Sequence, residues 1–116
     1  MKKKTAIVTG GAGFIGSHMV DILLEKNFEV RIVDDFSGGH EKNLKNHTKD
    51  ANIKIEKIDI VDLKPNTSLF KDVDYVFHFA GKGDIVPSIE QPVKYMNTNI
   101  LGTIKVLECA RNSNIK

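Results

Sequence analysis

Apolar and polar positions change their spacing several times along the chain. Residues 5–9 form a short, almost wholly apolar run, which is typical of a parallel strand buried on both faces. Residues 29–33 and 75–79 predict two more strands, and residues 53–58 predict a more exposed strand near an edge. Helical segments are expected at residues 14–26, 41–46, 68–72 and 93–112, and connecting segments at residues 36–39, 59–65 and 81–87.

Two of the predicted helices carry apolar residues at spacings of three and four. In residues 14–26 these positions are Ile15, Met19, Ile22 and Leu23. In residues 93–112 the shared face holds Met96, Ile100, Thr103, Leu107 and Ala110.

The alternation of strands and helices predicts an α/β fold with a Rossmann-like, doubly wound parallel sheet. Right-handed crossovers give the strand order 3-2-1-4, so the order reverses between the first and fourth strands. Ligands of such sheets bind outside the carboxyl ends of the strands at that reversal. The glycine-containing loops that follow the first and fourth strands are therefore expected to line one crevice.

The glycine cluster after the first strand has the spacing of a dinucleotide-binding turn. Two patterns fit, Gly10/Gly13/Gly16 and Gly11/Gly13/Gly16, so the sequence leaves the first glycine open. Gly10 or Gly11 would supply the positive φ of a sharp turn. Gly13 would let the backbone approach a pyrophosphate at the helix N-terminus, and Gly16 would let the helix lie against the sheet.

Acidic residues end the second and third predicted strands. Asp34 can accept hydrogen bonds from both ribose hydroxyls of an adenosine and would repel a 2′-phosphate, which favours NAD over NADP. The alternative for Asp34 is a residue that caps a helix or holds a turn. Asp59 could accept from the adenine amino group with Ile60 against the ring, or could simply form a turn.

Composition narrows the class of protein. The 116 residues, 41% of them hydrophobic, fit one small globular domain. The formal charge is +2 and the only basic run is residues 2–4, so we expect no nucleic-acid partner. No stretch is long and apolar enough for a membrane span or a signal peptide, and we expect a cytoplasmic protein. The single cysteine, Cys109, is expected to be a core thiol.

The four histidines show no metal-ligand spacing, and no metal is expected. His78 lies in a predicted buried strand and is expected to be a core histidine with its hydrogen bonds satisfied.

Several segments together resemble the extended short-chain dehydrogenase/reductase family, and within it the nucleotide-sugar epimerases and dehydratases of the UDP-glucose 4-epimerase type. The resemblance spans residues 5–116. The segments that carry it are residues 9–18, 34–39, 59–60, 78–81 and 99–103, with Ser88, Pro92, Leu107 and Glu108.

The resemblance implies an NAD cofactor and assigns its contacts. They are Gly10, Gly13, Phe14, Ile15 and Gly16 at the pyrophosphate, Asp34, Asp35, Ser37 and Gly38 at the adenine ribose, Asp59 and Ile60 at adenine, and Phe79, Ala80, Gly81 and Asn99 along the nicotinamide half.

Three of the polar residues keep a second interpretation. Asn99 is either a cofactor contact or a buried asparagine with its bonds satisfied. Ser88 either approaches the substrate or starts the turn before Pro92. Some sugar epimerases have a lysine where this chain has Gly83, and the adjacent Lys82 is either its substitute or a free surface lysine.

The family's catalytic groups are missing from these 116 residues. Catalysis in the family uses a Ser or Thr and a Tyr-x-x-x-Lys pair, whereas Tyr75 and Tyr95 are followed four residues later by Phe79 and Asn99. We therefore expect residues 1–116 to be a partial NAD-binding domain, the amino-terminal portion of a longer enzyme, that holds NAD but is inactive alone.

In the longer enzyme, hydride would move between a nucleotide sugar and bound NAD, and the resemblance implies a homodimer that pairs through helices including residues 93–112. Two alternatives remain, a stand-alone nucleotide-binding regulatory module and an NADP reductase of the same superfamily, the latter disfavoured by Asp34.

Overall fold

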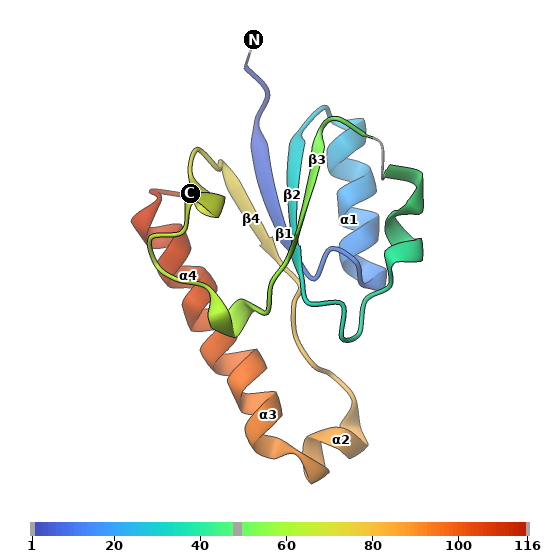
Figure 1. The fold of residues 1–116 in the computed structure, drawn as a ribbon, viewed down its shortest axis with the longest axis vertical. Coiled ribbons are helices and arrows are strands. Elements are labelled where there is room, and N and C mark those ends of the chain that lie inside the picture. The colour runs from blue at the N-terminus through green and yellow to red at the C-terminus, as the bar shows by residue number, and fades with distance from the viewer. Residues whose placement is uncertain (1, 48–49, 116) are drawn as a thin grey trace.

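The computed structural model describes residues 2–47 and 50–115. Its centre is a sheet of four parallel strands, β1 (Thr5–Thr9), β2 (Glu29–Asp34), β3 (Ile53–Lys57) and β4 (Tyr75–His78). The order across the sheet is β3-β2-β1-β4 (Figure 1). The predicted fold class and strand order are thus confirmed, and β3 lies at an edge as expected.

Helical segments cover both faces of the sheet (Figure 1). Helix α1 (Phe14–Glu25) and the 3₁₀ segment Glu41–His47 lie on one face; α4 (Gly102–Asn112) and the 3₁₀ segments Ile60–Asp62 and Ser68–Phe70 lie on the other. Each face has its own apolar core. Val8, Ile32 and Val20 belong to the core under α1, whereas Ile7, Val33 and Val106 belong to the core under α4.

The buried face of α1 is offset from the one suggested by apolar spacing. Its buried residues are Gly16, Ser17, Val20 and Leu23, whereas Ile15 is 64% and Ile22 46% exposed. The reason is the close approach of Gly16 to the turn after β1, where an added Cβ would overlap the carbonyl oxygen of Gly10. Because only glycine fits that contact, Gly16 sets which face of the helix meets the sheet.

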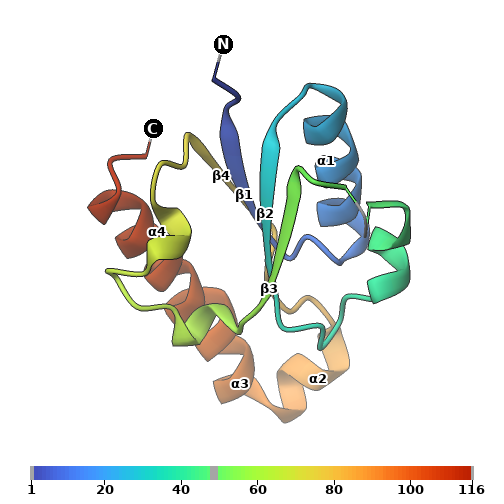
Figure 2. The ribbon, with the colours of Figure 1, turned by 45° about the horizontal axis from the view of Figure 1, so that its top comes forward.

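The segment after β4 confirms a helix over the predicted residues 93–112 but differs from the predicted loop before it. Helix α2 (Ile85–Glu90) begins inside the predicted loop, and α3 (Pro92–Met96) starts at a proline, which suits the first turn of a helix. A π-helical turn, Asn97–Leu101, then joins α3 to α4 without a break in the helix. Helices α2 and α3 extend beyond the carboxyl end of the sheet, as Figures 1 and 2 show.

Candidate functional site

A cleft lies at the carboxyl end of the sheet, where the loops after all four strands meet. Of the fifteen predicted cofactor residues, eleven line it, and they come from all four loops. These are Gly10, Gly13, Asp34, Asp35, Ser37, Gly38, Asp59, Ile60, Phe79, Ala80 and Gly81. The structure therefore brings together residues that are up to 71 positions apart, as the crossover at β1 and β4 requires.

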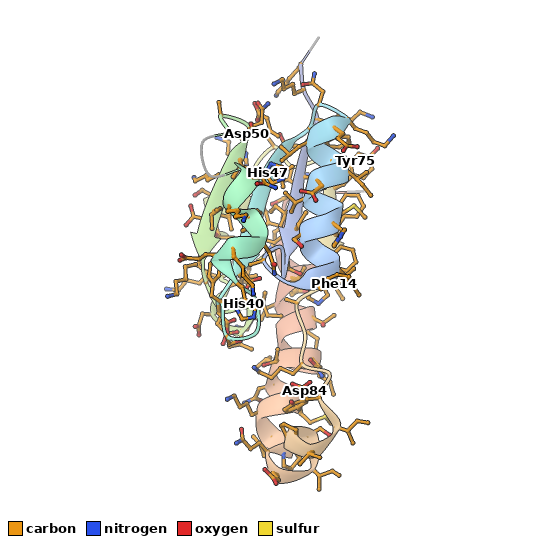
Figure 3. The ribbon with its side chains drawn as sticks, turned by 90° about the vertical axis from the view of Figure 1, so that its right-hand side faces the viewer. Phe14, His40, His47, Asp50, Tyr75 and Asp84 are labelled. Carbon is orange, nitrogen blue, oxygen red and sulfur yellow. The ribbon has the colours of Figure 1, made fainter. Side chains whose placement is uncertain are left out.

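The remaining predicted residues lie next to the cleft or apart from it. Phe14 and Ile15 are exposed at the start of α1, where Figure 3 labels Phe14, and Gly16 is buried against the glycine turn. Ser88, the predicted substrate residue, lines a neighbouring hollow together with Asn99. That hollow is lined by residues of α2, of α3 and of the loop before them, including Asp84, which Figure 3 labels.

The turn after β1 settles which glycine leads the cluster. Gly10 has φ +70°, and a Cβ there would lie 2.8 Å from the Ala80 nitrogen. Its own N–H donates to the Val33 carbonyl at 2.8 Å. Gly11 does not adopt a positive φ; a Cβ there would meet the Ile32 side chain at 2.7 Å. Gly10 therefore supplies the turn, and Gly11 is needed for packing on β2.

Asp34 joins the glycine turn to the loop after β2. The residue is 8% exposed, and its two carboxylate oxygens accept from the backbone nitrogens of Ala12 at 2.9 Å and Phe36 at 2.8 Å. Asp34 therefore holds a turn, as its alternative interpretation predicts. A carboxylate has about four acceptor sites, so these two bonds leave room for ribose hydroxyls.

The next residues along this loop stabilise a negative charge. Ser37 donates to the Asp35 carboxylate from its backbone nitrogen at 2.9 Å and from its hydroxyl at 2.7 Å. Burial alone would raise the pKa of Asp35, but the Ser37 hydrogen bonds and the nearby Lys82 charge outweigh burial and lower it below its usual value. Asp35 is therefore ionised at neutral pH at the mouth of the cleft.

Asp59 begins a short 3₁₀ segment, and its side chain accepts from the Val61 nitrogen at 3.1 Å. The turn-forming interpretation is therefore also present for Asp59. Ile60 is buried against α4, where a Cβ at Gly102 would collide with its side chain. This contact explains a glycine at the first position of α4.

Two polar side chains hold the loop after β4. Thr9 Oγ1 accepts from the backbone nitrogens of Phe79 and Ala80, both at 3.1 Å. The Asn99 side chain accepts from the Lys82 nitrogen at 2.8 Å and donates to the Lys82 carbonyl at 2.9 Å. Asn99 is exposed, so it is not the buried asparagine of the alternative interpretation; its amide fixes the loop that faces the cleft.

The ring of His78 has a partner at both nitrogens. Nδ1 lies 2.6 Å from Thr9 Oγ1, and Nε2 lies 2.9 Å from Thr103 Oγ1. The expectation of a histidine with its hydrogen bonds satisfied is confirmed, although the side chain is only half-buried. Burial lowers the pKa of His78.

The sequence did not single out every residue of the cleft. Lys82 and Thr98 line it, with Val33, Gly39 and Ile58. The sequence gives Lys82 two interpretations. Thr98 carries no signal of its own, because it belongs to the π-helical turn, which apolar spacing does not predict. Within residues 2–47 and 50–115, no helix is long and apolar enough to cross a membrane. No three His, Cys, Asp or Glu side chains of those residues are grouped as a metal site would require.

Comparison with known proteins gives consistent matches along the whole chain. The family model described as GDP-mannose 4,6 dehydratase matches residues 7–116. A putative UDP-glucose 4-epimerase of Methanocaldococcus jannaschii is 43% identical over 109 residues, which are 94% of this chain and 34% of that protein. The chain thus spans about a third of this relative's length.

Solved structures agree with the fold. A UDP-N-acetylglucosamine 4-epimerase from Methanobrevibacter ruminantium, in complex with UDP-N-acetylmuramic acid, superposes with a TM-score of 0.90 at 40% identity, covering 100% of this chain and 36% of that one. A dTDP-glucose 4,6-dehydratase from Streptomyces venezuelae with NAD and TYD bound has a TM-score of 0.88 at 32% identity, covering 96% and 37%.

The resemblance to nucleotide-sugar epimerases and dehydratases that the motifs carry is therefore confirmed at both the sequence and the structural level. Because a single family model accounts for all but the first six residues, the chain belongs to the GDP-mannose 4,6 dehydratase family.

Proposed function

We propose that residues 1–116 form the NAD(H)-binding part of a UDP-glucose 4-epimerase-like enzyme. The observation that carries this proposal is the cleft at the reversal of strand order, which collects glycine, acidic and apolar residues from the four loops. The dehydratase from Streptomyces venezuelae, which shares this fold, has NAD bound.

The glycine turn fits the pyrophosphate of such a cofactor. At Gly10 and Gly16 a Cβ would strike backbone atoms, so the turn is compact and presents its backbone to the cleft. The first N–H groups of α1 have no acceptor within the helix, and its positive end favours an anion. No acidic side chain lies in the first turn of α1 to compete for this position.

The opposite end of the cleft fits the adenosine. Asp34 offers its remaining acceptor sites to ribose hydroxyls, while Asp35 adds a second negative charge that opposes a 2′-phosphate. When bound, NAD would supply the chemistry of accepting hydride from a sugar and returning it. The chain's own part would be to hold the pyrophosphate at Gly10–Gly13, the adenosine at Asp34 and the nicotinamide half along Phe79–Gly81.

Two glycines allow a matched test of this proposal. Gly38 lines the cleft and Gly83 does not, yet a Cβ added at either meets nothing within 4 Å. Gly38→Leu should therefore weaken NAD binding, measured by calorimetry, by about tenfold or more while both variants fold normally. Gly83→Leu should bind like the unmodified chain. Equal NAD affinity of all three proteins, or no NAD binding by the unmodified chain, would contradict the proposal.

In the whole enzyme we propose a UDP-sugar as substrate, held beyond the nicotinamide half of the cleft near Ser88. The support is the hollow that Ser88 shares with Asn99 and Lys82, which continues from the cleft past the Lys82 loop. Because the Tyr-x-x-x-Lys pair is absent, residues 1–116 alone should bind NAD without turning over a sugar.

We also propose that the enzyme is a homodimer that uses the helices after β4. Large apolar side chains are exposed along them: Val93, Met96, Ile100, Ile104 and Leu107. Such a stripe on a water-exposed helix marks a surface that another chain or segment covers. Sedimentation of the whole enzyme should give a dimer, and Ile104→Lys should shift it toward monomer, whereas Ile55→Lys on the edge strand should not.

A further inference from the structure

A chain of hydrogen bonds runs through His78 and links β1 to the π-helical turn. It starts at the Thr9 hydroxyl, passes through both nitrogens of the His78 ring and reaches the Thr103 hydroxyl on α4. Thr103 then donates to the Asn99 carbonyl oxygen at 2.7 Å. Because Thr9 also binds the loop after β4, this chain connects the floor of the cleft to the helix beside it.

The donors along this chain can be assigned by counting. Thr9 Oγ1 accepts from the Ala80 nitrogen and from the Phe79 nitrogen, which it shares with the Thr9 carbonyl oxygen, so both of its acceptor sites are in use. At the other end Thr103 already donates its hydroxyl hydrogen to the Asn99 carbonyl, so Thr103 can only accept from His78. The Thr9 hydroxyl can then only donate a further hydrogen bond, and its partner is His78 Nδ1 at 2.6 Å. Nδ1 must therefore be an acceptor, so the ring's proton lies on Nε2 and is donated to Thr103.

No charged group takes part in this arrangement. The groups that face the ring from β1 and α4 are hydroxyls, and β1 carries no titratable side chain. The titratable side chains of α4 are Lys105, Glu108, Cys109 and Arg111, and β4 itself carries Tyr75. None of them contributes to the lowered pKa of His78, which burial alone causes.

We propose that His78 is a positioning residue whose neutral, Nε2-protonated ring holds the Phe79–Ala80 backbone in the shape that the cofactor cleft requires. A proton added to Nδ1 would bring a third N–H donor to Thr9 Oγ1, which has two acceptor sites. One of the three bonds must then be lost. The Phe79 N–H keeps the Thr9 carbonyl oxygen as a second acceptor, whereas the Ala80 N–H has Thr9 Oγ1 as its acceptor, so Ala80 is the loop residue most exposed to this change. His78 thus acts on the cofactor through Thr9 and the loop, without touching it.

The expected consequence is a loss of NAD affinity in acid. Losing one neutral hydrogen bond at the cleft wall should weaken binding by about three- to tenfold, which corresponds to about 0.7–1.4 kcal/mol. The drop should follow the protonation of His78, below the ordinary histidine value of about 6.5. This expected change in affinity rests on the proposed function, because NAD is its ligand. The tautomer of His78 and its effect on the loop do not depend on NAD.

The first test is nuclear magnetic resonance of the ring nitrogens in the chain without cofactor. At neutral pH the Nδ1 of His78 should have the shift of an unprotonated nitrogen and Nε2 that of a protonated one. On acidification, the Phe79 and Ala80 amide signals should move with the same midpoint as the ring. A proton on Nδ1 at neutral pH, or loop amides that do not follow the ring, would overturn the inference whether or not NAD binds.

The second test is NAD calorimetry at about pH 7.5 and about pH 5, on either side of the histidine range. The unmodified chain should bind about three- to tenfold more weakly at the lower pH. His78→Phe should be weak at both pH values, because it removes both ring nitrogens. His40→Gln removes an exposed histidine outside the chain of bonds and should keep the unmodified pH profile. A His78→Phe protein with that same profile would overturn the inference, whereas absence of NAD binding at every pH would instead overturn the proposed function.

Discussion

Replacing Gly10 by alanine should destabilise the fold more than the same replacement at any other glycine that lines the cleft. Gly10 adopts φ +70°, a left-handed conformation that costs a residue with a Cβ about 1–2 kcal/mol. The new methyl would also lie 2.8 Å from the Ala80 nitrogen and 2.9 Å from the Phe79 carbonyl carbon. Both neighbours are backbone atoms held by Thr9, so they cannot move aside without breaking bonds.

The two effects are distinct, because one is the cost of the left-handed backbone at residue 10 and the other is the contact of the new methyl with the loop after β4. Overpacking of a tight site typically costs about 1–3 kcal/mol, so the total loss for Gly10→Ala should be about 2–5 kcal/mol. Urea denaturation followed by circular dichroism measures it as a change in the free energy of unfolding. Gly38→Ala is the control, because its methyl meets nothing and its φ is not positive. We expect it to be neutral or stabilising by up to about 1 kcal/mol. If Gly10→Ala unfolds within about 0.5 kcal/mol of Gly38→Ala, the strain and contact argument is wrong.

Four further predictions follow from the same contacts. Asp34→Ala leaves the Ala12 and Phe36 nitrogens without acceptors and should lower the free energy of unfolding by about 1–3 kcal/mol, besides weakening NAD binding; an unchanged calorimetric titration would count against the ribose role. NADP should bind at least about tenfold more weakly than NAD, and equal affinities would support the reductase alternative. Burial raises the pKa of the Cys109 thiol, so it should react slowly with a thiol reagent at neutral pH and quickly in urea; rapid labelling of the folded chain would refute this. The purified 116-residue chain should convert no UDP-glucose, and any measurable conversion would overturn the expectation of inactivity.

β1 was predictable because it is a short apolar run, which a parallel strand buried on both faces needs. The exposed edge strand β3 was instead predictable from the alternation of Ile53 and Ile55 with charged residues. Their boundaries agree with the structure to within one residue. Helix α2 and the π-helical turn were not predictable in this way. The π-helical turn keeps Asn99 directed at both backbone groups of Lys82, a contact between residues 17 positions apart that no local spacing reveals.

In the site itself, the first glycine of the motif also cannot be identified from the sequence. The spacing of the cluster allowed Gly10 or Gly11, and the choice depends on the path of the chain between β1 and β4. Gly11 is needed for a different reason, which is the side chain of Ile32 on the neighbouring strand. A motif spacing records that a glycine is required but not which neighbour requires it.

The cleft is shaped by side chains that stand beside the cofactor's expected position, and this changes how substitutions there should be interpreted. Asp34, Thr9 and Asn99 each bind backbone groups of a loop that lines the cleft. Removing any of these side chains would shift a loop that lines the cleft. A loss of NAD affinity in such a variant would therefore not by itself show a contact with NAD. Gly38 differs because a larger side chain there breaks no bond and enters open space. If a larger side chain at Gly38 lowers NAD affinity without changing stability, NAD must occupy the cleft. Only after that result can a loss of affinity in an Asp34 or Asn99 variant be assigned to a change in the NAD site.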